Sequence, residues 1–163
     1  LGQLRPRPFD IAVCELPAVL DDTLTLLRPN LIKHHILVKS SLAPDLPAVD
    51  ASRAHILQVC LNIAMNAIDA MPGGGNLNVT LSSDVRRVPG VLMRFADSGK
   101  GIAGEDLTHI YEPFFTNGKA KGVGRGLTIT RDIVERHHGQ LIIQSPPGSG
   151  AVVDVWLPLK HEA

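Results

Sequence analysis

The stretch HILQVCLNIAMNAIDAM, residues 55–71, contains no Lys, Arg, Glu, Gly or Pro, and its apolar residues recur as in a helix. After its first residue the only polar side chains are Gln58, Asn62, Asn66 and Asp69, which are spaced to share one helical face. A helix that is apolar around the rest of its surface is buried, and buried amides need partners. The stripe is therefore either a solvent edge or the lining of a ligand site. Solvent edges usually carry Lys and Glu, so two asparagine amides one turn apart favour a ligand oxygen or a hydrated cation.

Working outward, the chain alternates between strand and helix patterns. We expect strands in six segments: residues 9–16, 35–42, 76–83, 91–97, 140–145 and 151–159. We expect helices at 16–29, ending near Pro29, at about 52–71, capped by Asp50 or Ser52, at 105–111 and at 127–138. Residues 112–126 are too rich in Gly and Lys to predict regular structure. Two strand pairs joined by short polar segments predict hairpins. The pattern predicts an α/β two-layer sandwich, with a mixed sheet of about five strands and three longer helices on one face.

The composition limits the classes of function. The chain has 163 residues, of which 44% are hydrophobic and 20% charged, and its formal net charge is zero. These values predict one domain at 1–163 and give no indication of nucleic acid or a membrane surface as a partner. No signal peptide or membrane-spanning stretch is evident, and the missing initial Met predicts a fragment, with residues 1–8 as a connector. Cys14 and Cys60 are expected in the core, in a reducing compartment. The histidines are not spaced like metal ligands.

A second polar site is predicted where the strand at residues 91–97 ends in Asp97. Gly99, Gly101 and Gly104 follow, and they match the G-x-G-x-x-G dinucleotide fingerprint. A Rossmann site requires a parallel βαβ unit, whereas the hairpin pattern here is antiparallel. The other interpretation is that the Asp97 carboxylate accepts hydrogen bonds from an exocyclic amine, while the glycines let a flat ring such as adenine approach the backbone.

A third site is predicted in the loop before the last helix. Glycines at 118, 122, 124 and 126 leave backbone N–H groups free to face an anion, and a helix begins next. This is a phosphate cradle, but it is not a Walker A loop, because the chain contains no Gly-Lys-Ser/Thr. Lys119 and Lys121 could neutralise phosphate charge. The alternative is a plain linker with solvated lysines.

Four motifs in these places, taken together, resemble one family. They are NIAMNAIDA, DSGKGI, EPFF and GVGRGL, at residues 62–70, 97–102, 112–115 and 122–127. In this order and spacing they resemble the N, G1, F and G2 boxes of the histidine-kinase catalytic and ATP-binding domain, over about residues 9–159. The segments NAIDAM and EPFFT are most similar to those of the nitrogen-regulation branch of these kinases. The resemblance implies the Bergerat fold, with ATP and Mg²⁺ as cofactors.

The resemblance also implies a role for individual residues. Asn66 would be the catalytic residue that holds the Mg²⁺ bridging the phosphates, and Asp97 would bind the adenine amine, with Gly99 and Gly101 shaping the pocket. Phe114 and Phe115 would anchor a lid that is hinged at Gly122, Gly124 and Gly126. The other implied nucleotide contacts are Asn62, Asp69, Ala70, Ile102, Thr116, Lys119, Lys121, Val123, Arg125 and Leu127.

The type of reaction is a separate question, because the same superfamily contains ATP hydrolases. Those enzymes carry a Glu one turn before the metal-binding Asn, where it activates water, whereas this chain has Asn62. An amide cannot take a proton at neutral pH, so the residue favours a kinase. The implied partners are a histidine on a separate dimerisation domain and, indirectly, a response regulator. The expected location is the cytoplasm, with the parent protein either anchored in a membrane or not, and the piece itself monomeric.

The chain departs from the family pattern at four positions. Val123 and Arg125 replace the usual Thr and Leu, Gln140 replaces a Gly, and Ala151 stands where a Thr is common near adenine. One lost hydroxyl contact would weaken binding by roughly 1 kcal/mol. These departures keep open a third alternative, an interaction module that has retained the fold and lost the nucleotide.

Overall fold

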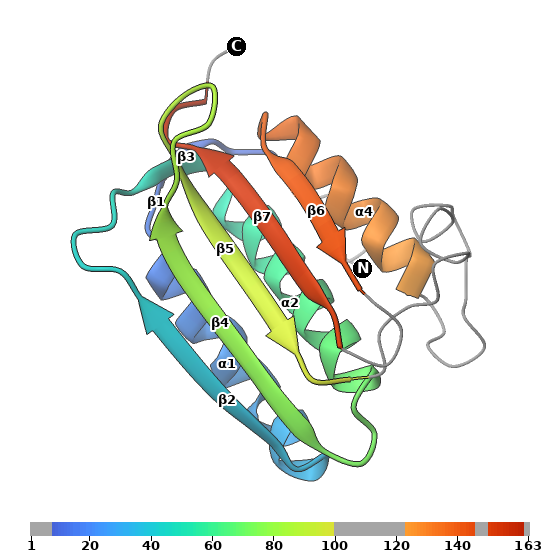
Figure 1. Ribbon diagram of the computed structural model, residues 1–163. Helices are drawn as coiled ribbons and strands as arrows, with labels where there is room; N and C mark the ends of the chain where they lie inside the picture. Colours follow the sequence, from blue (N-terminus) through green and yellow to red (C-terminus); the bar gives the residue numbers. More distant parts are fainter. Residues whose placement is uncertain (1–7, 100–122, 146–149, 162–163) are drawn as a thin grey trace.

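The computed structural model describes residues 8–99, 123–145 and 150–161, and these form two layers, a sheet and three helices packed on one of its faces (Figure 1). The helices are α1 (Leu16–Lys33), α2 (Arg53–Asp69) and α4 (Val123–Arg136). The main sheet consists of β2 (Ile36–Leu42), β4 (Gly75–Ser83), β5 (Gly90–Asp97), β7 (Val152–Pro158) and β6 (Gln140–Gln144), in that spatial order. A separate pair is formed by β1 (Ala12–Cys14) and β3 (Val49–Ala51). The predicted α/β sandwich is confirmed.

The main sheet is mixed, as predicted. β2 pairs with β4 in parallel, whereas the β4–β5, β5–β7 and β6–β7 pairs are antiparallel, so both predicted hairpins are present. In β5, Gly90 lies opposite Pro158 and Asp97 lies opposite Leu77. The strand therefore connects the loop between β4 and β5 with the opposite end of the sheet, where the carboxylate of Asp97 lies.

The central helix α2 confirms the apolar pattern that predicts it. Its side chains Ile56, Val59, Cys60 and Ala64 are fully buried against the sheet and its neighbours. Each fully buried larger aliphatic side chain contributes roughly 1.5–3 kcal/mol, so this face fixes the helix on the sheet. The polar stripe lies away from that core and is only partly covered.

The first helix continues past the predicted end. Pro29 lies inside α1, which runs to Lys33. A proline in a helix removes one backbone hydrogen bond and usually ends the helix. Here Leu27 and Leu31, on either side of the proline, are both buried, and their burial holds the helix together through that point.

The last helix begins earlier than predicted. We expected irregular backbone up to Gly126, whereas α4 starts at Val123, so Gly124 and Gly126 are helical. Glycine costs about 1 kcal/mol relative to alanine in a helix interior. That cost is offset by tertiary packing, because Leu127 and Thr130 in the following turn are buried. The predicted helix start was wrong because the packing of α4 outweighs the low helix propensity of its glycines.

A cluster of rings joins the beginning of α2 to the end of α4. The backbone N–H of Ser52 donates to Nε2 of His137 (3.0 Å), so the proton of this ring is on Nδ1, which donates to the Ile133 carbonyl (2.8 Å). Ser52 Oγ lies 2.7 Å from Nδ1 of His55, and the Phe9 ring packs 4.6 Å from the His137 ring. Burial lowers the pKa of His137. Ser52 is the N-cap residue of α2, but its hydroxyl makes no capping bond.

Candidate functional site

Asn66, near the end of α2, has a buried polar atom with unused hydrogen-bonding capacity. Its Nδ2 has no hydrogen-bond partner in the part of the chain that the structure describes. Buried polar groups are nearly always paired, so an orphaned amide nitrogen points to a ligand, a water or an ion at that position. A half turn of the amide exchanges its nitrogen and oxygen, which lets this position present an oxygen to a cation.

Asp97, at the end of β5, has one carboxylate oxygen held by the backbone. Oδ1 accepts hydrogen bonds from the N–H groups of Gly99 (2.8 Å) and Ala151 (3.2 Å). The backbone N–H of Asp97 in turn donates to the Ala151 carbonyl (2.9 Å). Among the described residues, Oδ2 has no hydrogen-bond partner. The carboxylate is therefore fixed in orientation and has one oxygen free to accept a hydrogen bond from an amine.

The charged form of Asp97 is destabilised by partial burial. Burial raises the pKa of this carboxyl, and the hydrogen bonds from Gly99 and Ala151 lower it in part. A partly desolvated carboxylate forms stronger hydrogen bonds than one in water. The site is thus prepared for a donor that enters with the ligand.

Two glycines let the chain pass very close to Asp97 and to the end of α2. A Cβ on Gly99 would lie 2.7 Å from the Ala70 carbonyl oxygen and 3.0 Å from Asp97 Oδ1. Gly150 has φ +82°, and a Cβ there would collide with the Asp97 carbonyl oxygen. These contacts bring the G1 motif against Ala70, so α2 and β5 meet at this end of the molecule.

The beginning of α4 closes the other side of α2. Asn62 Nδ2 lies 3.5 Å from Thr130 Oγ1, and Thr130 is fully buried between the helices. Leu127 is also buried. Gly126 has open space where a Cβ would be. Asn62 thus links α2 to α4, one helical turn from Asn66.

Asp69 lies at the last turn of α2 and is exposed. Partial desolvation on the side that faces the protein raises the pKa of its carboxyl, and the nearby His34 lowers it in part. His34 follows α1, so the structure places Asp69 within electrostatic range of the end of that helix. Its predicted role in nucleotide binding stays a prediction.

Several predicted residues lie outside the described part of the chain. They are Gly101, Ile102, Phe114, Phe115, Thr116, Lys119, Lys121 and Gly122, together with the predicted short helix at 105–111. Val123, Gly124 and Arg125 belong to the first turn of α4. Of the predicted residues, the structure brings Ala70, Asp97 and Gly99 together, and Asn62 contacts Thr130 of α4. Asn66 lies one turn from both Asn62 and Ala70 on α2, and Gly126 and Leu127 lie in α4.

Three residues that build the site have only a weak signal, or none, in the sequence. Gly150 and the backbone of Ala151 position Asp97, and Thr130 contacts Asn62. The signal for Gly150 was the Gly-Ser-Gly turn before the last strand. In the sequence, Ala151 is notable only because it lacks the hydroxyl of the Thr that is common there. Its contribution to the Asp97 carboxylate is a backbone N–H, which any residue except proline offers.

The donor set fits a magnesium nucleotide. An amide at Asn66 suits a hard cation that takes its remaining ligands from phosphate oxygens and water. The free oxygen of Asp97 suits the exocyclic amine of adenine, and the absence of side chains at Gly99 and Gly150 keeps the backbone close around that carboxylate.

The chain belongs to the family described as histidine kinase-, DNA gyrase B- and HSP90-like ATPases, whose profile matches residues 51–161. The matched region contains α2, Asn66 and Asp97. Within that family, its similarity is to sensor histidine kinases. It is 33% identical over 159 residues to sensor histidine kinase ZraS of Escherichia coli K12, which covers 98% of this chain and 33% of that protein. It is 32% identical over 145 residues to sporulation kinase E of Bacillus subtilis, covering 89% of this chain and 19% of that protein. The chain thus spans about a third or less of the length of these relatives.

Solved structures agree with this assignment. The catalytic domain of histidine kinase ThkA superposes with a TM-score of 0.80 at 26% identity, covering 93% of this chain and 97% of that one. Full-length ShkA in complex with AMPPNP has the same fold in this region, with a TM-score of 0.82 at 23% identity over 98% of this chain and 33% of that one. The predicted resemblance to histidine-kinase catalytic domains is confirmed. In the part of the chain that the structure describes, no helix is both long and apolar enough to cross a membrane.

Proposed function

We propose that this chain binds Mg-ATP where α2, the end of β5 and the beginning of α4 meet, and that it transfers the γ-phosphoryl group to a histidine on a separate dimerisation domain. The observation that carries the proposal is the buried Nδ2 of Asn66, which has no hydrogen-bond partner among the described residues. An orphaned polar atom costs about 1–3 kcal/mol, so a protein retains one where a ligand satisfies it.

The adenine end of the nucleotide is assigned to Asp97. Its Oδ1 is fixed by two backbone N–H groups, so Oδ2 presents its lone pairs in one direction. The exocyclic amine of adenine would donate to Oδ2. Guanine carries a carbonyl at the corresponding ring position, so this arrangement favours ATP over GTP.

The phosphate end is assigned to Asn66 and to the first turn of α4. Magnesium bound there with the nucleotide would neutralise phosphate charge. Asn66 would orient the ion, and the backbone N–H groups at the start of α4 would face the phosphates. Lys119, Lys121 and the glycines of the predicted lid belong to the same proposal. Catalysis in this arrangement is mainly positioning of the γ-phosphoryl group for an external nucleophile.

Transfer is favoured over hydrolysis by the residue one turn before Asn66. Asn62 is an amide that contacts Thr130, and it cannot act as a general base for water. We therefore propose slow hydrolysis of bound ATP. This distinguishes the chain from hydrolases of the same family.

The partners follow from the kinase assignment. We propose that residues 1–163 are one catalytic domain of a longer protein, that it acts in the cytoplasm, and that the phosphorylated histidine serves a response regulator. Histidine kinase ThkA has been solved in complex with response regulator protein TrrA, and this chain superposes on that kinase with a TM-score of 0.77 at 25% identity, over 97% of this chain and 44% of that one. The nitrogen-regulation branch stays a prediction, because the relatives named above carry sensor-kinase and sporulation-kinase names.

The decisive experiment is calorimetric titration with ATP and ADP, with and without magnesium. The wild-type chain should bind both nucleotides, and magnesium should increase the affinity. Asn66→Ala should lose the magnesium dependence and bind roughly a hundredfold more weakly. Asn78→Ala, which removes an exposed amide from β4, is the matched control and should bind like the wild type.

Three outcomes would contradict the proposal. If the wild-type chain binds no nucleotide, it is an interaction module that has kept the fold. If Asn66→Ala binds as tightly as the control, the site assignment is wrong. Phosphate release and phosphorylation of the parent's dimerisation domain, measured with the same ATP, separate the two reactions: rapid release without transfer would make the chain a hydrolase.

A further inference from the structure

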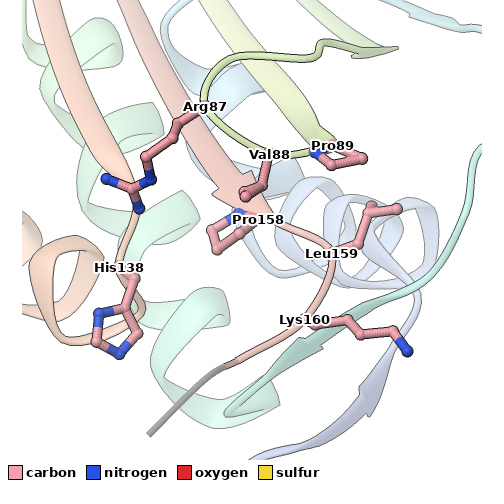
Figure 2. Close-up of a pocket in the computed structure, with 7 residues that line it drawn as sticks. All are labelled: Arg87, Val88, Pro89, His138, Pro158, Leu159 and Lys160. Atoms are coloured by element: carbon pink, nitrogen blue, oxygen red, sulfur yellow. The ribbon is translucent and has the colours of Figure 1, made fainter.

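A pocket lies at the end of β5 opposite to Asp97. It is about 410 Å³ in volume and is formed by three segments, the loop between β4 and β5, the second residue after the end of α4 and the end of β7 with the two residues that follow it. Its lining residues are Arg87, Val88, Pro89, His138, Pro158, Leu159 and Lys160 (Figure 2). The volume is within the usual range for small-molecule sites.

The walls of this pocket are held in place by hydrogen bonds. The backbone N–H of Leu159 donates to the Pro89 carbonyl (3.0 Å), which ties the loop between β4 and β5 to the end of β7. The indole N–H of Trp156 donates to the Asp84 carbonyl (2.8 Å), so the base of the same loop is fixed on the sheet. A site whose walls are already ordered loses less conformational entropy on binding a ligand.

Two neighbouring arginines in this loop differ sharply in their contacts. Arg86 is satisfied inside the protein, because Nε donates to Asp84 (2.9 Å), Nη1 donates to Gln140 (2.6 Å) and the guanidinium lies over the Trp156 ring. Arg87 lines the pocket and has no ion pair with any described residue. The first arginine holds the loop, and the second is free to bind a ligand.

The two side chains of fixed charge that line the pocket have the same sign. Arg87 and Lys160 are cationic and exposed, His138 is an exposed imidazole, and none of the seven lining residues is acidic. Lys160, like Arg87, forms no ion pair within the described ranges of the chain, whereas Arg94 is paired with Asp154 at 2.8 Å. In a chain with zero formal net charge, unpaired cations on both sides of one pocket mark a place for an anion.

The apolar residues lie between the cations. Figure 2 shows Arg87 and His138 on one side of Pro158, with Leu159 and Lys160 on the other. Val88 and Pro89 add apolar surface at the top of this view. A ligand that fills the pocket would therefore place an apolar body on these residues and an anionic group near a guanidinium, which binds carboxylate and phosphate in the same forked geometry.

We propose that this pocket binds a small organic anion that has an apolar body and a carboxylate or phosphate group. The site is separate from the nucleotide site, since the two lie at opposite ends of β5. The proposal does not depend on ATP binding, so each can fail without the other.

The test is a titration followed by two-dimensional N–H NMR spectra of the wild-type chain without nucleotide. Benzoate and phenyl phosphate are the probes, and they distinguish a carboxylate from a phosphate ligand. Either probe should cause saturable shifts at the amides of Val88, His138 and Leu159. Benzamide, which has the same ring without the charge, should bind at least about tenfold more weakly.

The double variant Arg87→Ala/Lys160→Ala should weaken binding of the better probe by about tenfold or more. The matched control Arg28→Ala/Lys39→Ala also removes an exposed arginine and an exposed lysine, but from α1 and β2, and should bind like the wild type. The proposal is overturned if neither probe shifts these amides, if benzamide binds as well as benzoate, or if the two double variants bind equally. Thermal unfolding of both variants checks that they are folded.

Discussion

The two ends of α2 differ in whether their buried polar groups are hydrogen-bonded. At the beginning of the helix, Ser52 and His137 satisfy one another, and the second ring nitrogen of His137 is bonded to Ile133. On the order of 20 Å along the helix, Nδ2 of Asn66 is buried and has no partner within the described ranges of the chain. Nearby, one oxygen of Asp97 is held by the backbone and the other has no partner among the described residues.

This difference separates structural from functional polar groups. A buried group that is fully hydrogen-bonded stabilises the fold, and removing it leaves its partners unpaired. A buried group with unused hydrogen-bonding capacity costs stability until a ligand satisfies it. Substitutions at the first end should therefore affect folding, and substitutions at the second end should affect binding.

The largest effect is expected at His137. His137→Ala would leave the Ser52 N–H unpaired, would remove one of the two hydrogen bonds that the Ile133 carbonyl accepts and would open a cavity between α2 and α4. We expect a loss of about 3 kcal/mol in the free energy of unfolding, measured by denaturant titration. Nucleotide affinity per folded molecule should change little. His34→Ala, at a partly exposed histidine, should cost less than about 0.5 kcal/mol. Equal losses in the two variants would show that the cluster is not structural.

Asp97→Asn should give the reverse pattern. The amide oxygen can still accept from Gly99 and Ala151, while the amide nitrogen replaces the free acceptor with a donor. ATP affinity should fall by roughly a hundredfold, or about 2–3 kcal/mol.

The stability of Asp97→Asn should stay equal or increase at neutral pH. Burial raises the pKa of Asp97 above 3.8, which means that its charged form destabilises the folded state. Asp45→Asn, at an exposed carboxylate, is the control for affinity. A large loss of stability in Asp97→Asn, or unchanged ATP binding, would place Asp97 among the structural groups.

The smallest effect is a pH dependence of stability. The folded-state pKa of His137 is below its ordinary value of 6.5, so the unfolded chain takes up a proton that the folded chain resists. The contribution of His137 is complete above 6.5 and decreases as the pH falls through 6.5 towards the folded-state pKa. Protonation would put a hydrogen on Nε2 and remove the acceptor for Ser52.

The measurement is the free energy of unfolding over a series of pH values in the wild type and in His137→Gln. The wild type should lose up to about 1 kcal/mol more than the variant per pH unit in this range. The comparison is needed because the charges of His161, His55 and Arg136 also lower the pKa of His137, and these three residues remain in the variant. Parallel pH profiles would show that protonation of His137 is not linked to unfolding.

Much of the fold was predicted from local patterns. The period of the apolar residues in 55–71 predicted α2, and alternation in 76–83 and 91–97 predicted the first hairpin. The errors were at places where packing opposed local propensity. Burial of Leu27 and Leu31 keeps α1 helical at Pro29. Burial of Leu127 and Thr130 stabilises α4, whose first turn contains glycine.

The part of the candidate site that depends on the type of side chain could be predicted from the sequence. Asn66, Asp97 and Gly99 could be named because an amide, a carboxylate and a glycine have few roles in such surroundings. The contribution of Ala151 could not be predicted, since a backbone N–H is common to nearly all residues and its partner is 54 positions away. The same holds for the pocket at Arg87 and Lys160, which needs three distant segments to meet.

The sequence by itself determined which groups this protein offers: a buried helix with one polar stripe, a carboxylate at a strand end, glycines around it and an α/β order of elements. Only the tertiary structure decided which of those groups are satisfied and which are left open. Arg86 and Arg87 are identical and adjacent, and yet one is paired with Asp84 and the other has no ion pair with a described residue. The physical reason is that hydrogen bonding is a property of pairs, and the partner of a buried group is set by the path of the whole chain.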